Sequence, residues 1–187
     1  MPFSAEPFVG NLPPIGGKMP AAQAGTASMN DALENAKWGA LVESLPQAFY
    51  DRALLLGARL RQEVTKISEH CGRLLTLQFG TRVDRKSVQE AILSLSPDGG
   101  ARSTDLLIIA DMLGCGGADD IGRLAALTAR ALPRGGHCAL LHWTDGSLCG
   151  ASGEAGAEEF VRLAQPRLQP LLRRRTPEFR LDILERA

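Results

Sequence analysis

The sequence lacks an excess of charge of either sign. Its 21 Lys and Arg residues balance 21 Asp and Glu residues, so the formal net charge is zero at neutral pH. A chain without net charge has no overall field that would draw it onto nucleic acid or an anionic membrane. We therefore expect no nucleic-acid partner.

Long apolar runs are also missing. Stretches such as Leu106–Ala110, bounded by Asp105 and Asp111, are far too short to span a bilayer. Prolines at positions 2, 7, 13 and 14 interrupt the N-terminal segment, and this pattern argues against a secretion signal. We therefore expect no membrane span and a cytoplasmic location.

Closely spaced cysteine pairs are absent as well. The sequence has four widely spaced cysteines: Cys71, Cys115, Cys138 and Cys149. A chain of 187 residues can bury an adequate core without disulfides, so we expect free thiols and a reducing compartment. Two His-Cys neighbours occur, but adjacent residues on a strand point to opposite faces, so we expect no metal site.

The first 29 residues differ in composition from the rest of the chain. Residues 1–28 are mostly Pro, Gly, Ala and small polar residues, with Glu6 and Lys18 as the only charged side chains. Such a segment cannot build a core, so we predict an extended arm over residues 1–29 and a folded domain over residues 30–187. Apolar side chains that could dock into another surface are scattered through the arm: Phe3, Phe8, Val9, Leu12 and Ile15. A docking arm and a disordered leader both remain open.

From residue 30 onward the pattern predicts helices that alternate with strands. Helices are predicted from Asn30 or Asp31 to about residues 46–50, and over residues 60–71, 119–132 and 153–164. Strands are predicted over residues 52–57, 73–79, 104–112 and 137–143, with a closing hairpin of residues 168–175 and 179–184. Residues 87–95 fit either a third strand or a helix. This order predicts an α/β fold with a mostly parallel sheet and helices on both faces.

Four segments resemble a known family. They are Asp105-Leu-Leu-Ile-Ile-Ala-Asp111, Ala131-Leu-Pro-Arg-Gly-Gly-His137, His142-Trp143 and Phe179-Arg-Leu-Asp-Ile-Leu-Glu-Arg186. With them, the stretch from about residue 30 to the end looks like the class I S-adenosylmethionine-dependent methyltransferases, in particular the bacterial branch similar to the nodulation N-methyltransferase. The resemblance implies a Rossmann-like three-layer sandwich with a C-terminal antiparallel hairpin.

The resemblance also implies a place for S-adenosylmethionine. If the cofactor binds, it would lie near five residues: Gly57, Ala58, Gln78, Asp98 and Asp111. In the family, the first strand carries an acidic residue and leads into a Gly-x-Gly-x-Gly loop. Here the stretch reads Leu55-Leu-Gly-Ala-Arg-Leu-Arg61, with one glycine of three and no acid. The second strand ends in Gln78, a weaker acceptor for ribose hydroxyls than the family's carboxylate.

Two functional hypotheses follow from this resemblance. In an active enzyme, Asp111 would position an amine or take its proton, and His142 would be a base. Without catalysis, Asp111 is a strand-end carboxylate that caps nearby backbone amides. We favour a catalytically degenerate binding or assembly subunit without a cofactor, because several cofactor contacts are missing at once. The alternatives are an active S-adenosylmethionine-dependent methyltransferase of a small molecule and a scaffold for another nucleotide-like metabolite.

The last 28 residues are distinctly basic, with seven arginines against three acidic residues. The run Arg173-Arg174-Arg175 is either a solvated part of the hairpin or a contact for an acidic partner. Together with the apolar arm of residues 1–28, it predicts a protein partner or self-association.

Overall fold

Six strands form one sheet at the centre of the molecule. The computed structural model describes residues 21–58, 63–79, 84–95, 104–144 and 153–187. Its strands are β1 (Tyr50–Ala58), β2 (Cys71–Phe79), β3 (Leu106–Ala110), β4 (His137–Trp143), β5 (Leu168–Arg175) and β6 (Phe179–Arg186). They follow the order β2-β1-β3-β4-β6-β5, in which β1 to β4 are parallel and β6 is antiparallel to both neighbours. The predicted mostly parallel sheet with a C-terminal antiparallel hairpin is confirmed.

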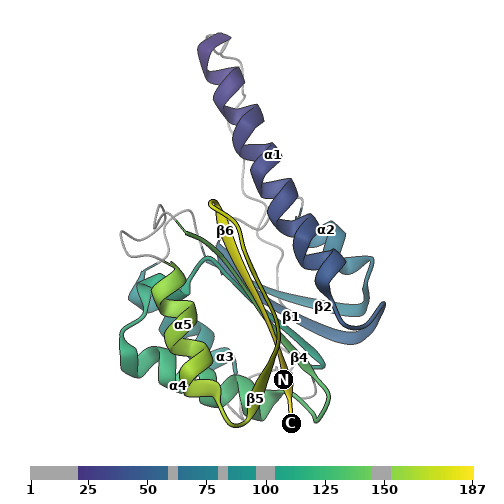
Figure 1. Cartoon of the computed structure of the whole chain (residues 1–187), viewed down its shortest axis with the longest axis vertical. Helices are drawn as coiled ribbons and strands as arrows, with labels where there is room; N and C mark the ends of the chain where they lie inside the picture. The colour runs from purple at the N-terminus through teal and green to yellow at the C-terminus, as the bar shows by residue number, and fades with distance from the viewer. Residues whose placement is uncertain (1–20, 59–62, 80–83, 96–103, 145–152) are drawn as a thin grey trace, which may run out of the picture.

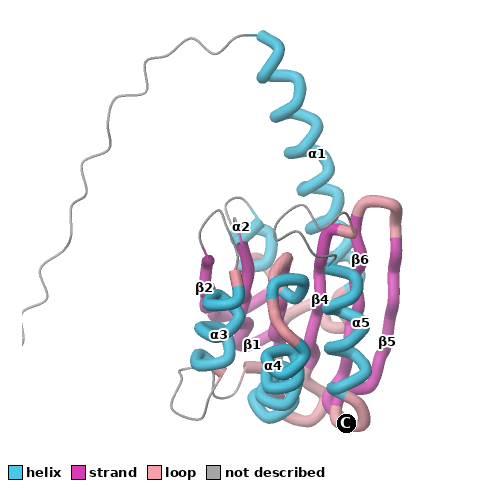
Figure 2. Tube along the Cα trace, turned by 90° about the vertical axis from the view of Figure 1, so that its left-hand side faces the viewer, coloured by secondary structure: helices cyan, strands magenta, loops and turns pink. Residues whose placement is uncertain are grey.

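Helices cover both faces of this sheet (Figure 1). The helices are α1 (Ala21–Ser44) and α2 (Glu63–Ser68) on one face, and α3 (Arg85–Ser94), α4 (Ala118–Ala131) and α5 (Gly153–Ala164) on the other. Figure 2 shows α3, α4 and α5 in front of the strands. Successive strand residues face opposite sides, so Leu54 and Leu56 pack towards α3 to α5, while Leu55 packs towards α1 and α2. Because both faces of the central strands are covered, β3 is apolar and buried along its whole length.

Helix α1 begins earlier than predicted. The sequence predicted an extended arm up to residue 29, but the helix starts at Ala21. The alanine-rich stretch of residues 21–28 favours the early start, because alanine has the highest helix propensity. The N-terminal half of α1 projects beyond the sheet (Figure 1). Residues 1–20, with the apolar side chains of the predicted arm, lie outside the described residues.

Residues 87–95, which fitted either a strand or a helix, form most of α3. A capping box starts this helix, in which Ser87 N donates to Asp84 Oδ1 at 3.0 Å and Asp84 N donates to Ser87 Oγ at 3.3 Å. Val88, Ala91 and Ile92 then recur at helical spacing and are buried. Within the described residues no strand lies between β2 and β3, so β2 forms an edge of the sheet. The strand predicted over residues 104–112 is therefore β3.

The cysteines differ from the prediction. Cys71 and Cys138 are free and buried. Cys115 ends the short 3-10 helix η1 (Leu113–Cys115) and is disulfide-bonded, so the prediction of free thiols throughout is wrong. Wide sequence spacing was a poor guide, because a disulfide depends on which cysteines the fold brings within reach. Cys149 lies outside the described residues.

Among the residues described, no helix has both the length and the apolar character needed to cross a membrane. In the same ranges, no three His, Cys, Asp or Glu side chains come together as a metal site would require.

Candidate functional site

Four of the five residues predicted to lie near a cofactor are at the carboxyl edge of the sheet. Gly57 pairs with Gln78 across β1 and β2, and Ala58 follows Gly57 at the end of β1. On the other side, Gly57 pairs with the last residue of β3, and Asp111 comes directly after it. Parallel strands end at the same edge, which is where ligands bind in open α/β sheets. The fold therefore brings together the described part of the predicted cofactor site.

The two positions at which the sequence resemblance implied acidic cofactor contacts carry an apolar and a neutral side chain. Leu55 is completely buried in the apolar cluster between β1 and the helices α1 and α2. Gln78 is exposed near the end of the edge strand β2. Asp98, expected as a substitute acid, lies outside the described residues, as do Arg59 and Arg61.

A buried ion pair joins α1 to the end of β3. The Lys37 side chain has no exposed surface, and its Nζ donates to Asp111 Oδ2 at 2.5 Å. The second carboxylate oxygen, Asp111 Oδ1, accepts from the backbone N–H of Trp143 at 3.1 Å. Asp111 N donates in turn to Leu141 O at 2.9 Å. The Asp111 carboxylate is thus held between α1, β3 and β4.

Asp111 adopts a left-handed backbone conformation, with φ at +54°. This region is uncommon for residues other than glycine, although Asp tolerates it better than most. Backbone strain of this kind costs about 1–3 kcal/mol and persists only where the surrounding contacts hold it. Here the ion pair and the two hydrogen bonds to β4 supply those contacts.

Glu34 and two tryptophans complete the surroundings of the Lys37 ammonium. Glu34 Oε2 lies 3.4 Å from Lys37 Nζ, and the ring centroid of Trp143 lies 4.0 Å from it. The Trp38 ring centroid is farther away, at 6.0 Å. Both indole N–H groups donate to the Glu34 carboxylate at 3.2 Å. We call these five residues, Glu34, Lys37, Trp38, Asp111 and Trp143, the Lys37 cluster.

The α1 members of the Lys37 cluster were missed in the sequence, although a signal was present. Glu34, Lys37, Trp38 and Leu41 follow the i, i+3, i+4, i+7 spacing of one helix face. Trp38 and Leu41 are the apolar members of this stripe, and both are buried. Charged residues on a buried helix face need partners elsewhere in the fold. The positions of Glu34 and Lys37 on this face could therefore have indicated a buried ion pair.

His142 lies at the same edge as Asp111 but faces the other side of the sheet. Trp143 faces α1, so its neighbour His142 faces α5, where the backbone of Gly153 lies against it. Both ring nitrogens are buried and lack a hydrogen-bond partner among the described residues. Burial, followed by the positive charges of Lys37 and Arg180, lowers the pKa of His142 to about 3. A ring that resists protonation in this way is poorly suited to the predicted role of a base.

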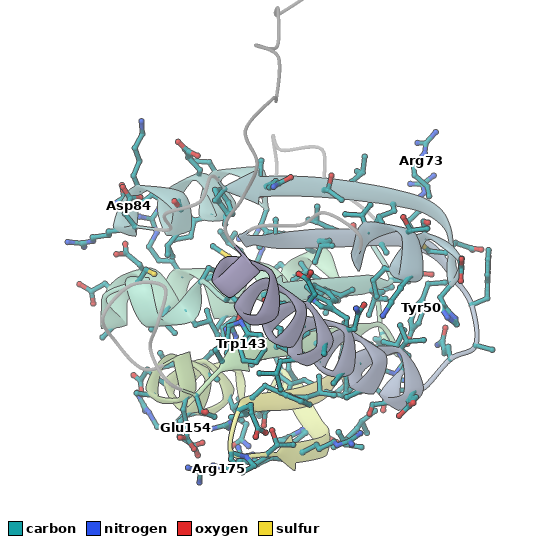
Figure 3. The ribbon with its side chains drawn as sticks, turned by 90° about the horizontal axis from the view of Figure 1, so that it is seen from above. Tyr50, Arg73, Asp84, Trp143, Glu154 and Arg175 are labelled. Carbon is teal, nitrogen blue, oxygen red and sulfur yellow. The ribbon has the colours of Figure 1, made fainter. Side chains whose placement is uncertain are left out.

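The predicted partner-binding arginines lie on the edge strand β5. Two of them pair within the chain: Arg173 with Asp182 at 2.8 Å and Glu158 at 3.5 Å, and Arg175 with Glu154 at 2.9 Å. Figure 3 shows Arg175 and Glu154 close together beside the hairpin. Arg174 lies 4.0 Å from Glu43, at the limit of an ion pair. Much of the local positive charge is therefore offset within the molecule, although all three side chains are about half-exposed or more.

No protein-family model matches the chain, and no curated protein matches its sequence. Solved structures do match. A candidate methyltransferase from Pseudomonas syringae has a TM-score of 0.62 and 18% identity, covering 82% of this chain and 99% of that one. The N-methyltransferase NodS from Bradyrhizobium japonicum WM9 has a TM-score of 0.61 and 17% identity, covering 82% and 96%. Geranyl diphosphate C-methyltransferase from Streptomyces coelicolor A3(2) has a TM-score of 0.59 and 12% identity, covering 92% and 88%.

At these identities the likeness concerns the fold alone. NodS has also been solved with S-adenosyl-L-homocysteine, and that structure matches this chain with a TM-score of 0.59. The expectation drawn from the sequence segments is confirmed at the level of architecture. The chain has the Rossmann-like fold of the class I S-adenosylmethionine-dependent methyltransferases.

Proposed function

We propose that this chain is a methyltransferase-fold protein that acts by binding and does not transfer methyl groups. The buried contact between Lys37 and Asp111 carries the proposal. The resemblance to methyltransferases implies that Asp111 lies beside the position where the methyl group is transferred. An amine attacks a methyl group through its lone pair, whereas Lys37 Nζ lies there as an ammonium in an ion pair. The chain's own side chain thus takes the place that an amine substrate would need.

The cofactor side supports the same proposal. A hydrogen bond that a carboxylate accepts from the cofactor contributes about 1.5–3 kcal/mol to the free energy of binding. Leu55 and Gln78 stand where the family has two such carboxylates, so their loss weakens cofactor binding by about two orders of magnitude or more. Leu55 also packs in the apolar core, so no local rearrangement of its side chain supplies an acceptor.

The binding role would be carried by the N-terminal part of the chain. Helix α1 projects well beyond the sheet (Figure 1), and residues 1–20 with their apolar side chains precede it. We propose that this region contacts a protein partner or a second copy of the chain. Deleting residues 1–20 leaves α1 intact and should lower the assembly state or abolish co-purification. An unchanged size-exclusion mass together with unchanged pull-downs would reject this role.

A second candidate function is an active methyltransferase of a small molecule. Gly57 is kept at the end of β1, and Asp111 keeps an acid at the end of β3. Lys37 lies on α1, a helix outside the sheet, so movement of that helix would free the Asp111 carboxylate. In that case S-adenosylmethionine would bind near Gly57, Ala58 and Gln78.

The two candidate functions predict different results when methyl transfer from S-adenosylmethionine is assayed. S-adenosylhomocysteine release is measured after incubation of the full chain with S-adenosylmethionine and a panel of small primary amines. We expect no release above background from the wild type or from Lys37→Ala, with Lys86→Ala as the control for an exposed lysine. Turnover by the wild type would establish the active candidate. Turnover by Lys37→Ala alone would show that the cofactor binds and that Lys37 blocks the acceptor site.

A further inference from the structure

The groups around Lys37 Nζ match the chemistry of an ammonium ion, whichever molecule supplies it. A carboxylate oxygen of Asp111 accepts one N–H at 2.5 Å, and a second carboxylate, that of Glu34, lies 3.4 Å away. The face of Trp143 is 4.0 Å from the nitrogen, a favourable cation–π distance. These three groups come from α1, β4 and the end of β3, so the fold itself assembles them.

The charges near this position favour a cation. Among the described residues, the carboxylates of Glu34 and Asp111 both face the Lys37 ammonium, so these three groups together carry one net negative charge. His142 lies behind the edge of the sheet and is uncharged at neutral pH, because burial and nearby positive charges lower its pKa. The nearest buried cation on that face, Arg180, is itself paired with Asp182 at 2.6 Å. Emptying the position of Lys37 would therefore remove the cation that both carboxylates contact in the described part of the chain.

Hydrogen bonding selects the kind of ammonium. A contact of 2.5 Å to Asp111 needs an N–H donor, which a quaternary ammonium lacks. The whole Lys37 side chain is buried, so its methylene groups also lie in a space closed to water. An unbranched alkyl chain that ends in –NH3⁺ fits both requirements. Glu34 is about one-third exposed, so this carboxylate connects the position to solvent.

We propose that Glu34, Asp111 and Trp143 form a binding site for a primary alkylammonium group, of which Lys37 is the built-in occupant. The ligand class is a lysine side chain or a small unbranched aliphatic amine. The inference goes beyond the proposed function, which assigns protein binding to the N-terminal part of the chain. It rests on that proposal only for the idea that the edge of the sheet binds without catalysis. In the wild type, an external amine must displace Lys37, whose tether gives it a high effective concentration.

The test empties the site and refills it. Lys37→Ala removes Cγ, Cδ, Cε and Nζ, which together correspond to n-propylammonium. The variant is purified and refolded with n-propylammonium acetate, because loss of a buried cation can prevent folding. Thermal unfolding is then followed as a function of n-propylammonium, with n-propanol as the uncharged match and sodium acetate as the ionic-strength control. Lys37→Met, whose side chain fills the space without charge, serves as the matched variant.

We expect n-propylammonium to raise the midpoint of Lys37→Ala unfolding by about 3–5 °C in a saturable manner. The same amine should leave Lys37→Met and the wild type nearly unchanged, and n-propanol should not replace it. A second variant, Lys37→Ala with Asp111→Asn, should lose most of the shift. Equal effects of the amine on all variants would overturn the proposal. So would failure of Lys37→Ala to fold in the amine while Lys37→Met folds.

The thermal-unfolding test of the ammonium site and the turnover assay of the proposed function can fail independently. Thermal unfolding requires no methyl donor, so absence of the amine shift counts against the ammonium site whatever the turnover assay finds. Methyl transfer by the wild type counts against the proposed function even if n-propylammonium stabilises Lys37→Ala.

Discussion

Lys37 and Asp111 are 74 positions apart in the sequence, yet Lys37 Nζ and Asp111 Oδ2 are 2.5 Å apart in the fold. This ion pair joins α1 to the carboxyl edge of the sheet, where ligands bind in open α/β folds. It also holds Asp111 in a left-handed conformation that the residue would not favour alone. One contact thus links the position of α1, the geometry of the site and the proposed loss of catalysis.

Breaking the ion pair from one side should be strongly destabilising. Removal of one partner leaves an uncompensated buried charge, which typically costs about 3–5 kcal/mol. We expect Lys37→Met and Asp111→Asn each to lower the free energy of unfolding by that amount, as measured by chemical denaturation. The double variant should lose about 1–3 kcal/mol less than the sum of the single losses, because neither charge is then left alone.

The control for this cycle is the exposed pair of Lys86 and Glu90, whose charged atoms are 3.9 Å apart. Replacing either of these residues should change the unfolding free energy little. Strict additivity at Lys37 and Asp111 would mean that the two side chains do not interact in solution.

The buried ring of His142 should make the protein sensitive to acid. Its pKa is about 3 in the folded protein and near 6.5 in an unfolded chain. As the pH falls below 6.5, the unfolded chain takes up a proton that the folded protein refuses until about pH 3. Stability is therefore lost on acidification, by about 1.4 kcal/mol per pH unit within this window.

His142→Leu should remove this contribution while keeping the site apolar. Stability of the variant and the wild type is compared by denaturant unfolding between about pH 6.5 and pH 4.5. The variant should lose less stability on acidification, by about 1.4 kcal/mol per pH unit at the acid end. Parallel pH profiles would show that the ring is protonated in the folded protein or exposed to water. Other buried groups, including His137, contribute equally to both profiles.

Two glycines should respond in opposite ways to replacement by alanine. A Cβ at Gly156 of α5 would lie 2.6 Å from the backbone of Leu113, which is too close for any real contact. A Cβ at Gly39 of α1 would meet nothing within 4 Å. We expect Gly156→Ala to lower the melting temperature by several degrees, and Gly39→Ala to stabilise by about 0.5–1 kcal/mol through helix propensity. A tolerated Gly156→Ala would contradict the close packing of α5 against η1.

The arginines of the hairpin should differ in their effect on stability. Arg180 is 3% exposed and pairs with Asp182, so Arg180→Met should be as costly as breaking the Lys37 pair. Arg174 is half-exposed and only 4.0 Å from Glu43, so Arg174→Ala should leave the melting temperature nearly unchanged. Similar losses for both variants would be inconsistent with this burial. Arg174→Ala is therefore the suitable variant for testing a contact between β5 and an acidic partner.

The order and type of most elements could be predicted from the sequence because the relevant signals are local. The helix of residues 153–164 and the strands of residues 137–143 and 168–175 have the predicted limits. Each combines a clear apolar pattern with Gly or Pro nearby. Helix α1 was predicted too short, because the Gly and Pro content of the arm outweighed the alanines of residues 21–28. Helix α3 was ambiguous, since the apolar positions in a segment of only nine residues fit both periods.

The site was only partly predictable, for a different reason. Gly57, Gln78 and Asp111 could be placed together, because parallel strands end at one edge. Lys37 could not be paired with Asp111, since the contact depends on how α1 crosses the sheet and no local pattern encodes that angle. His142 was expected near Asp111, but the alternation of strand residues turns it towards α5. The bond at Cys115 likewise depends on tertiary contacts alone.

The accessibility of Lys37 is the most direct measure of whether its ammonium is held in the site. The native protein is treated with an amine-acetylating reagent, and the modification of each lysine is quantified by mass spectrometry after digestion. Lys86, with an 80% exposed side chain, is the reference, and Lys37 has no exposed side-chain surface. We predict that Lys86 reacts to completion while Lys37 stays largely unmodified, and that Asp111→Asn speeds the reaction of Lys37. Equal rates for Lys37 and Lys86 in the wild type would show that α1 does not close the site.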